Sequence, residues 1–307
     1  MSSVICVTGG AGFIGSHVAE ALVADGHQVV IVDDLSSGCK ENVPEGAELA
    51  VLDVRSEEAG RLLVEREVEV LVHHAAQMDV RRSVENPVFD ADVNILGLLN
   101  LLEAARDAKL RQVVFASTGG AIYGEQDFSP ANESHPARPV SPYGVAKLAC
   151  ERYLFYYHCQ YGLDATCLRY ANVYGPRQNP HGEAGVVAIF ARRLLDGGQP
   201  MIHGDGLQTR DYVYVADVVR ANLAAVGRSG FSTYNVGTGI ETDVNILYTH
   251  IAVALGSGKE AIHDAPQPGE QRRSCISSNL LKRELGVSVE TPLAEGIGHT
   301  VEWFKEN

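Results

Sequence analysis

The spacing of apolar residues divides the chain into two parts. Up to about residue 170, short runs rich in β-branched residues alternate with longer stretches whose apolar residues recur at helical intervals. This alternation predicts an α/β fold, a parallel sheet with helices on both faces, and a glycine-rich first turn favours the doubly wound, Rossmann-type form over a barrel. The pattern predicts strands at 4–8, 29–33, 48–52, 68–73, 113–116 and 165–169, and helices at 12–25, 88–108 and 141–161.

The pattern changes beyond residue 171. Residues 172–185 are rich in Gly, Pro and His, and short mixed elements follow, including a helical run at 186–195. We expect a sheet domain at 1–171 and a smaller C-terminal lobe at 172–307, from which the chain can re-enter the first domain. A length of 307 residues suits one large domain or a large and a small one.

Composition and charge narrow the classes of function. The net charge of −14 argues against a nucleic-acid surface, and 45% hydrophobic with 21% charged residues is an ordinary globular mixture. No apolar run reaches the roughly 18 residues of a membrane span, and no signal-peptide pattern opens the chain, so we expect no membrane contact and a cytoplasmic location. The six cysteines form no CxxC pair, which predicts reduced thiols and no metal site.

The first chemical motif is a glycine turn. Gly9, Gly12 and Gly15 follow the first predicted strand and open the first helix. Such glycines let the backbone approach a pyrophosphate, whose charge is stabilised at a helix N-terminus. Asp33 ends the second predicted strand, where a carboxylate accepts hydrogen bonds from the adenosine ribose and repels a 2′-phosphate. The sequence therefore predicts an NAD site rather than an NADP site.

Residues after the next predicted strands extend the cofactor site. Asp53 follows the third strand, where the adenine would lie, and small residues follow the fourth strand, where the cofactor would cross the sheet edge. The full set of predicted cofactor residues is Gly9, Gly12, Phe13, Ile14, Gly15, Asp33, Asp34, Ser37, Gly38, Asp53, Val54, His74, Ala75 and Ala76, together with Tyr143 and Lys147.

Tyr143 and Lys147 form the candidate catalytic pair. Ser141 and Pro142 are typical of a helix start, so the tyrosine and lysine, four residues apart, share one helix face. A free tyrosine has a pKa near 10, and a nearby cation lowers that pKa by favouring the phenolate. The pair can therefore take a proton from a sugar hydroxyl.

These motifs resemble the extended short-chain dehydrogenase/reductase family, and more closely its nucleotide-sugar epimerase branch. The resemblance covers nearly the whole chain, in the order and at the spacings of the family. Its motifs here are residues 8–15, 33, 53, 74–76, 115–124, 143–147, 168–176 and 210–212.

The resemblance implies a Ser or Thr at the end of the fifth strand that orients the reacting hydroxyl. The usual spacing to Tyr143 selects Thr118, and Ser117 is the alternative because the following Gly119-Gly120 pair can redirect the loop. Related dehydratases and decarboxylases carry an acidic residue just after this Ser or Thr, whereas this chain has Gly-Gly-Ala. Reversible oxidation at a single carbon is the chemistry that this difference favours.

The resemblance also implies a nucleotide-sugar site. Asn172 and Arg210 match residues that reach the diphosphate, and Gln267 replaces a second family arginine, for which Arg272 or Arg273 can compensate. Ser274 stands where some relatives place a bulky tyrosine, which predicts room for an N-acetyl group. Arg192-Arg193 could meet a uronate carboxylate, but the helical run favours a solvated face, and His181 and His203 are expected to be polar groups of a loop or pocket rather than metal ligands. The predicted substrate residues are Thr118, Tyr143, Asn172, Val187, Arg210, Arg272 and Ser274.

The expected reaction is epimerisation at C4 of a UDP-hexose, UDP-glucose to UDP-galactose, through a 4-keto sugar with NAD regenerated in each cycle. The alternatives are a UDP-N-acetylglucosamine or UDP-glucuronate 4-epimerase, a net nucleotide-sugar dehydrogenase or reductase, and a non-catalytic NAD-binding module. In relatives, helices like 88–108 and 141–161 pair across a two-fold axis, so the resemblance also implies a homodimer through a four-helix bundle.

Overall fold

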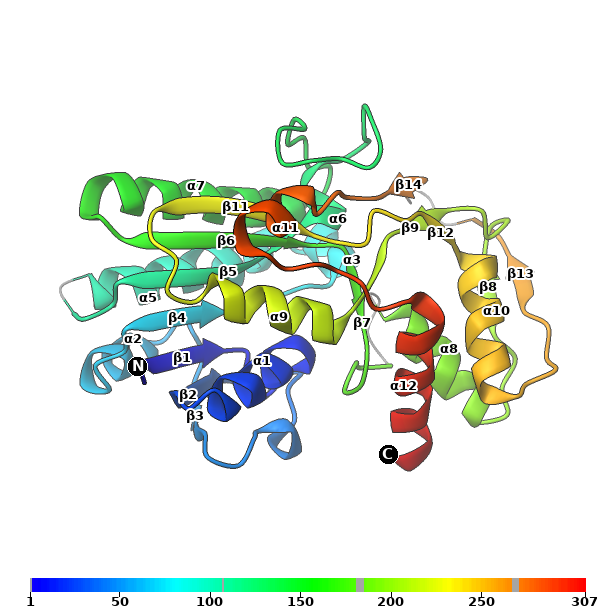
Figure 1. The fold of residues 1–307 in the computed structure, drawn as a ribbon, viewed down its shortest axis with the longest axis horizontal. Coiled ribbons are helices and arrows are strands. Elements are labelled where there is room, and N and C mark those ends of the chain that lie inside the picture. Colours follow the sequence, from blue (N-terminus) through cyan, green and yellow to red (C-terminus); the bar gives the residue numbers. More distant parts are fainter. Residues whose placement is uncertain (1, 107, 181–184, 267–270) are drawn as a thin grey trace.

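A seven-stranded parallel sheet forms the centre of the molecule (Figure 1). The computed structural model describes residues 2–106, 108–180, 185–266 and 271–307. Across the sheet the strand order is β11-β6-β5-β4-β1-β2-β3, so the order reverses between β1 and β4, where ligands bind in such sheets. The strands are β1 (Val4–Thr8), β2 (Gln28–Asp33), β3 (Glu48–Val51), β4 (Val70–His73), β5 (Gln112–Thr118), β6 (Asp164–Tyr170) and β11 (Phe231–Val236).

Helices cover both faces of this sheet, as the sequence predicts for a doubly wound fold. α1 (Phe13–Ala24), α9 (Val215–Ala225) and α11 (Asn279–Leu285) cover one face. α2 (Glu57–Glu65), α5 (Gly97–Ala105) and α7 (Pro142–Tyr161) cover the other. Because α9 and β11 belong to these layers, the chain returns to the sheet after first leaving it at the end of β6.

The region predicted as one helix at 88–108 is more complex. α3 (Val80–Glu85) precedes α4 (Pro87–Ala91), which continues through a π-helical segment, η2 (Asp92–Leu96), into α5. A π-helical turn inside a helix often marks a functional site. α2 has no counterpart among the predicted helices; its buried residues are only Ala59, Gly60 and Leu63, and the rest of the helix is largely polar.

The C-terminal lobe lies beyond the carboxyl ends of the sheet strands (Figure 1). Its apolar core lies between α8 (Val186–Leu195), α10 (Val244–Leu255) and α12 (Leu293–Glu306). The lobe region also holds three small sheets: β7 (Asn172–Tyr174) with β10 (Tyr212–Tyr214), β9 (Thr209–Arg210) with β12 (Thr242–Asp243) and β14 (Arg273–Ser274), and β8 (Met201–His203) with β13 (Ile262–Asp264). The short α6 (Gly119–Ile122) and a 3-10 turn, η1 (Lys40–Asn42), complete the elements.

All six cysteines lie in the described part of the chain as free thiols, four of them buried. Within the described residues, no helix has both the length and the apolar character to cross a membrane. The same part of the chain holds no group of three or more His, Cys, Asp or Glu side chains arranged for a metal ion.

Candidate active site

Backbone geometry explains the glycines of the first turn. Gly9 has a φ of +69°, and a Cβ there would lie 2.7 Å from the backbone nitrogen of Ala75. A Cβ on Gly15 would lie 2.1 Å from the carbonyl oxygen of Gly9. At Gly12, by contrast, the only described neighbour within 4 Å is that same oxygen, at 3.2 Å. The turn is therefore held tightly against the end of β4 and is open at Gly12, where a pyrophosphate could approach.

The start of α1 and the end of β2 supply the polar groups around this turn. Gly12 is the N-cap of α1 and no side chain caps that end, so the N–H groups of the first turn, which includes Phe13 and Ile14, can donate to anionic oxygens. Asp33 is buried, and its carboxylate accepts hydrogen bonds from the N–H groups of Ala11 and Leu35, both at 2.9 Å. These bonds fix the carboxylate and leave it further acceptor capacity for ribose hydroxyls.

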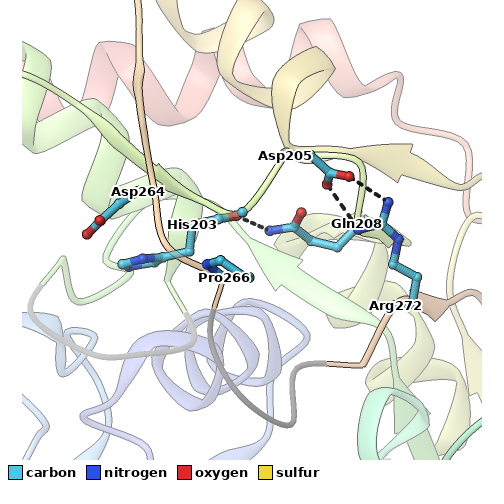
Figure 2. Close-up of a pocket in the computed structure, with 7 residues that line it drawn as sticks. His203, Asp205, Gln208, Asp264, Pro266 and Arg272 are labelled. Atoms are coloured by element: carbon cyan, nitrogen blue, oxygen red, sulfur yellow. Dashed lines mark hydrogen bonds and ion pairs between the residues drawn. The ribbon is translucent and has the colours of Figure 1, made fainter.

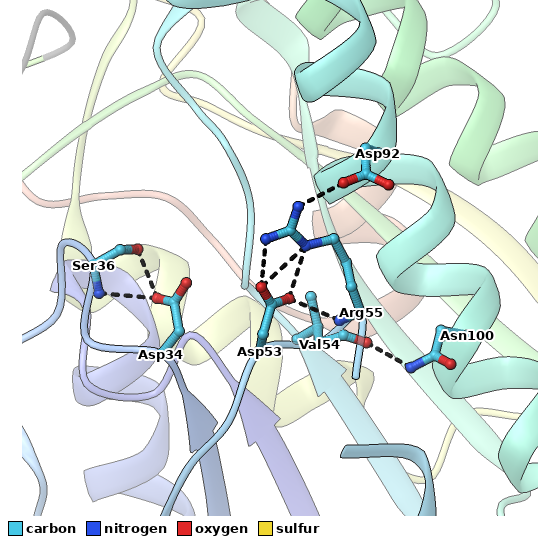
Figure 3. Close-up of polar contacts among 7 residues, drawn as sticks. All are labelled: Asp34, Ser36, Asp53, Val54, Arg55, Asp92 and Asn100. Carbon is cyan, nitrogen blue, oxygen red and sulfur yellow. Dashed lines mark hydrogen bonds and ion pairs between the residues drawn. The ribbon is translucent and has the colours of Figure 1, made fainter. Parts of the chain in front are cut away.

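The residues that follow β2 and β3 form a more exposed rim (Figure 3). Asp34 accepts hydrogen bonds from the backbone N–H and the hydroxyl of Ser36, at 2.9 and 2.6 Å. Asp53 accepts from Nε of Arg55 at 2.9 and 3.0 Å, and Arg55 also reaches Asp92 at the start of η2. Hydrogen bonding to Arg55 lowers the pKa of Asp53. The end of β3 is thereby linked to η2 through one guanidinium group.

Two further predicted cofactor residues lie next to these groups. Val54 is buried, and its carbonyl accepts from Nδ2 of Asn100 at 2.8 Å. A Cβ on Gly38 would lie 2.9 Å from Oδ1 of Asp33, so the absence of a side chain keeps that oxygen accessible, whereas Ser37 is exposed.

His74 contributes a half-buried, neutral imidazole just after β4. Burial lowers its pKa to about 3, Nε2 contacts the hydroxyl of Tyr170 at 3.2 Å, and Nδ1 has no hydrogen-bond partner among the described residues. Ala75, which follows, donates its N–H to Oγ1 of Thr8 at 3.2 Å, and Ala76 is half-buried beside it. An unsatisfied buried nitrogen beside the glycine turn is suited to a polar ligand. Together with the open turn and the fixed Asp33, it fits a dinucleotide such as NAD.

The two hydroxyls at the end of β5 have different surroundings. Ser117 donates to Oε1 of Glu151 at 2.6 Å, and Glu151 forms a buried ion pair with Arg169. Thr118 is half-buried and caps α6, with Oγ1 accepting from the N–H of Ala121 at 3.2 Å. A hydroxyl that accepts one bond can still donate its hydrogen, so Thr118 is better suited than Ser117 to bind a substrate hydroxyl.

Tyr143 and Lys147 share one face of α7, as their spacing predicts. Ser141 caps the helix by accepting from the N–H of Gly144 at 3.2 Å, with Pro142 in the first helical position. Tyr143 lies in the first turn, and the Lys147 Nζ is 5.9 Å from the centre of its ring. The buried Nζ donates to the carbonyl oxygen of Ala116 at 2.9 Å. This bond holds the lysine side chain against the last residues of β5.

The electrostatics of this pair differ from the sequence expectation. A nearby cation was expected to lower the pKa of Tyr143, but burial raises it. Burial also lowers the pKa of Lys147 to about 8. Burial is the largest cause for both groups, and the ammonium of Lys147 is hydrogen-bonded to the Ala116 carbonyl. The protein alone therefore keeps Tyr143 as the neutral phenol.

A buried polar network beside this pair was not predicted. Asp90 of α4 is 1% exposed, and its Oδ1 accepts from Gln77 at 3.1 Å and from Asn94 at 3.0 Å, whereas Oδ2 has no partner among the described residues. Its charge raises the pKa of both Tyr143 and Lys147. Asp90 and Asn94 stand four residues apart in the predicted helix and so share one of its faces, which is the signal that could have identified them.

Adjoining strands of the C-terminal lobe bring three predicted substrate residues together. Arg210 of β9 and Ser274 of β14 are register partners in a parallel pair. The N–H of Asn172 donates to the carbonyl oxygen of Asp211 at 2.9 Å, which joins β7 to the same region. Asp211 is itself buried and accepts from the backbone of Thr238. Val187 is buried among the apolar residues of the lobe, so only its backbone could reach a ligand.

Arg272 and Arg273 have different surroundings. A cavity of about 480 Å³ lies beside Arg272 (Figure 2). Arg272 lines it and donates from both terminal nitrogens to Asp205, at 3.0 Å each. Arg273 instead pairs with Glu241. Gln267 stands at the position of the family arginine for which Arg272 or Arg273 was expected to compensate; it and His181 lie outside the described residues. The other residues that line the cavity are His203, Gly204, Gln208, Asp264 and Pro266.

Arg192 and Arg193, for which no ligand was expected, lie near the end of α8. Arg193 is exposed, and Arg192 lies over the ring of Phe304 at 5.6 Å.

Comparison with known proteins shows the family to which the chain belongs. Residues 5–237 match the model of the NAD dependent epimerase/dehydratase family. A UDP-glucose 4-epimerase of Mycolicibacterium smegmatis is 48% identical over 305 residues, which are 97% of each chain. The crystal structure of Thermotoga maritima UDP-glucose 4-epimerase with UDP-glucose has a TM-score of 0.96 and 46% identity, covering 99% of both chains. That of the Thermus thermophilus enzyme with NAD has a TM-score of 0.93 and 46% identity, covering 98% of this chain and 99% of the other.

The chain therefore belongs to the NAD-dependent epimerase/dehydratase family, within the extended short-chain dehydrogenases/reductases. The expected fold class and family are confirmed.

Proposed function

We propose that the protein interconverts UDP-glucose and UDP-galactose by NAD-dependent epimerisation at C4. The observation that carries this proposal is the likeness, at 46–48% identity over nearly the whole chain, to UDP-glucose 4-epimerases, two of them solved with UDP-glucose or NAD. The meeting of Thr118, Tyr143 and Lys147 at the carboxyl edge of the sheet supports it. The non-catalytic alternative needs none of these three side chains.

The proposed mechanism assigns one task to each residue. Thr118 donates to the C4 hydroxyl and orients it, and Tyr143 takes the hydroxyl proton and later returns it. Lys147 binds the nicotinamide ribose and supplies positive charge near the phenol. When bound, NAD accepts hydride from C4 and gives it back to the opposite face, and its positive ring adds to the charge that favours the Tyr143 phenolate. The hexose passes through a 4-keto state between these transfers.

The sugar must turn without leaving, so the nucleotide has to be held separately. Arg210 and Asn172 are proposed to bind the diphosphate, and the Arg272 cavity to receive part of the nucleotide. A guanidinium group can bind two phosphate oxygens at once. Binding energy from the nucleotide then retains the mobile keto sugar. The buried, small Ser274 next to Arg210 supports UDP-N-acetylglucosamine as an additional substrate.

The test compares the purified protein with its Tyr143→Phe variant. The parent is expected to convert UDP-glucose to UDP-galactose without added reductant, resolved by chromatography or NMR. The variant is expected to lose at least roughly 100-fold in kcat, since general acid–base groups contribute about that much or more, while binding NAD as before. Turnover by the variant at the parental rate would remove Tyr143 from the mechanism. Parallel incubations with UDP-N-acetylglucosamine and UDP-glucuronate test the alternative substrates.

A homodimer is also proposed, through the faces of α4–η2 and α7. Exposed apolar side chains gather there: Val88 (78%) and Leu96 on the first, Val145 (51%) and Tyr156 on the second. Two such faces from each of two chains would make a four-helix bundle that covers them. Light scattering is expected to give twice the mass of 33.0 kDa, and the mass of a single chain would contradict the proposal. A cytoplasmic location stays a prediction from the sequence.

A further inference from the structure

The backbone conformation at Gly120 of α6 does not require a glycine. Its φ lies outside the left-handed region that favours glycine. Glycine inside a helix is less stable than alanine, because the chain loses more freedom on folding. The neighbouring Gly119 does have a reason, since a Cβ there would lie 2.5 Å from Cδ1 of Ile276. Packing therefore explains Gly119 but leaves Gly120 unexplained.

The surroundings of Gly120 indicate what its missing side chain leaves open. A Cβ at Gly120 would lie 3.7 Å from Oδ1 of Asn172 and 3.8 Å from Oγ1 of Thr118, both ordinary contact distances. Apart from its own helix and chain neighbours, no other described atom lies within 4 Å. The space above Gly120 is thus bordered by the two polar groups proposed to bind the reacting hydroxyl and the diphosphate.

We propose that Gly120 is a specificity-determining residue that keeps open the space between Thr118 and Asn172 in which the hexose binds and turns. This rests on the proposed function. An alanine at this position fits the protein itself without a clash. Its methyl group is therefore expected to hinder the bound ligand rather than the fold. A larger β-branched side chain would fill the same space further.

The test uses Gly120→Ala and Gly120→Val, with Gly298→Ala as the matched control. Gly298 is also helical, in α12, and a Cβ there would meet nothing within 4 Å. Both alanine variants are expected to melt at or above the parental temperature, because alanine favours the helix. In NAD-loaded protein, Gly120→Ala is expected to lower kcat/KM for UDP-glucose by roughly 10-fold and Gly120→Val by roughly 100-fold, as overpacking does, while Gly298→Ala changes nothing.

Calorimetric titration with UDP and with UDP-glucose completes the test. Gly120→Ala is expected to weaken binding of UDP-glucose and to leave binding of UDP, which has no hexose, unchanged. If the parent converts UDP-glucose and Gly120→Ala keeps kcat/KM within about 2-fold, or if UDP and UDP-glucose weaken equally, the role of Gly120 is refuted while the epimerase function stands. A parent that converts no UDP-hexose refutes the proposed function itself, and with it the role of Gly120.

Discussion

Three ionisable side chains lie at the proposed reaction centre, and the charge of Asp90 acts on the other two. Tyr143 and Lys147 project from α7, and the carboxylate of Asp90 acts on both from α4. Burial disfavours every charge in this group, and the negative charge of Asp90 partly offsets that effect for Lys147 by raising the pKa of the ammonium. Asp90 is therefore a positioning residue that helps to keep Lys147 charged.

This role predicts a shift in the pH profile of Asp90→Asn. The amide removes the charge but keeps an oxygen that can accept from Gln77 and Asn94. Without the carboxylate, the pKa of Lys147 falls further below its present value of about 8. Activity that needs the ammonium is lost as pH rises through that pKa, so the alkaline limb of kcat/KM is expected to move to lower pH.

The measurement is kcat/KM for UDP-glucose between pH 6 and pH 9.5, at roughly half-unit intervals so that one pKa step is resolved. Asp196→Asn serves as the control, because Asp196 is an exposed residue that ends α8. An alkaline limb at the same pH in the parent and in Asp90→Asn would contradict the coupling between Asp90 and Lys147.

At the residue scale, the sequence predicted the placement of the catalytic pair on its helix but not its electrostatics. The four-residue spacing alone predicted that Tyr143 and Lys147 share one helix face. The direction of the tyrosine pKa was wrong for the protein alone, because burial of the phenol and the bond from Lys147 to Ala116 arise only from tertiary packing. The roles of Gly120 and Asp90 were missed because each depends on a residue that is distant in sequence, Asn172 for Gly120 and Tyr143 for Asp90.

At the scale of elements, α7 is fastened to the sheet by a buried ion pair. Glu151 of α7 pairs with Arg169 of β6 and accepts from Ser117 of β5. The two side chains are 3% and 7% exposed, so neither charge has much access to water. This contact fixes the helix that carries Tyr143 against the strand that ends at Thr118.

The variant Glu151→Gln is expected to lower the free energy of unfolding by about 3–5 kcal/mol, because it leaves the buried guanidinium of Arg169 uncompensated. Denaturant titration monitored by circular dichroism measures this change. Glu58→Gln, in an exposed pair with Arg61, is the matched control and is expected to change little. Equal stability of the two variants would show that the buried pair does not hold α7.

Strong local signals decided which elements could be predicted. β1, β2 and β4 have nearly continuous apolar sequences, and α7 has a clear start at Ser141-Pro142, so their predicted ranges agree with the structure within a few residues, whereas the more polar β11 was not predicted. α2 buries too few residues to stand out. The π-helical turn of η2 has no spacing signal of its own, and its Asn94 side chain bonds to the backbone of Gln77, which lies outside the helix.

On the scale of the whole molecule, the site forms where the sheet meets the C-terminal lobe. The sheet supplies the glycine turn, Thr118 and the α7 pair, and the lobe supplies Asn172, Arg210 and the Arg272 cavity. The segment that follows α6 ties the two together, since Ala131 pairs with Ile276 and Gln126 bonds to Cys275. The motifs predicted the family, but not these contacts, which join segments more than 100 residues apart.

The central claim is that the hydrogen at C4 leaves as hydride and returns to the same carbon within one bound complex. UDP-glucose carrying deuterium at C4 tests this directly, with NAD-loaded protein and no further cofactor in ordinary water. We predict that UDP-galactose forms with the deuterium still at C4, as read by mass spectrometry and NMR. UDP-galactose in which hydrogen from the solvent has replaced the deuterium would contradict the hydride mechanism.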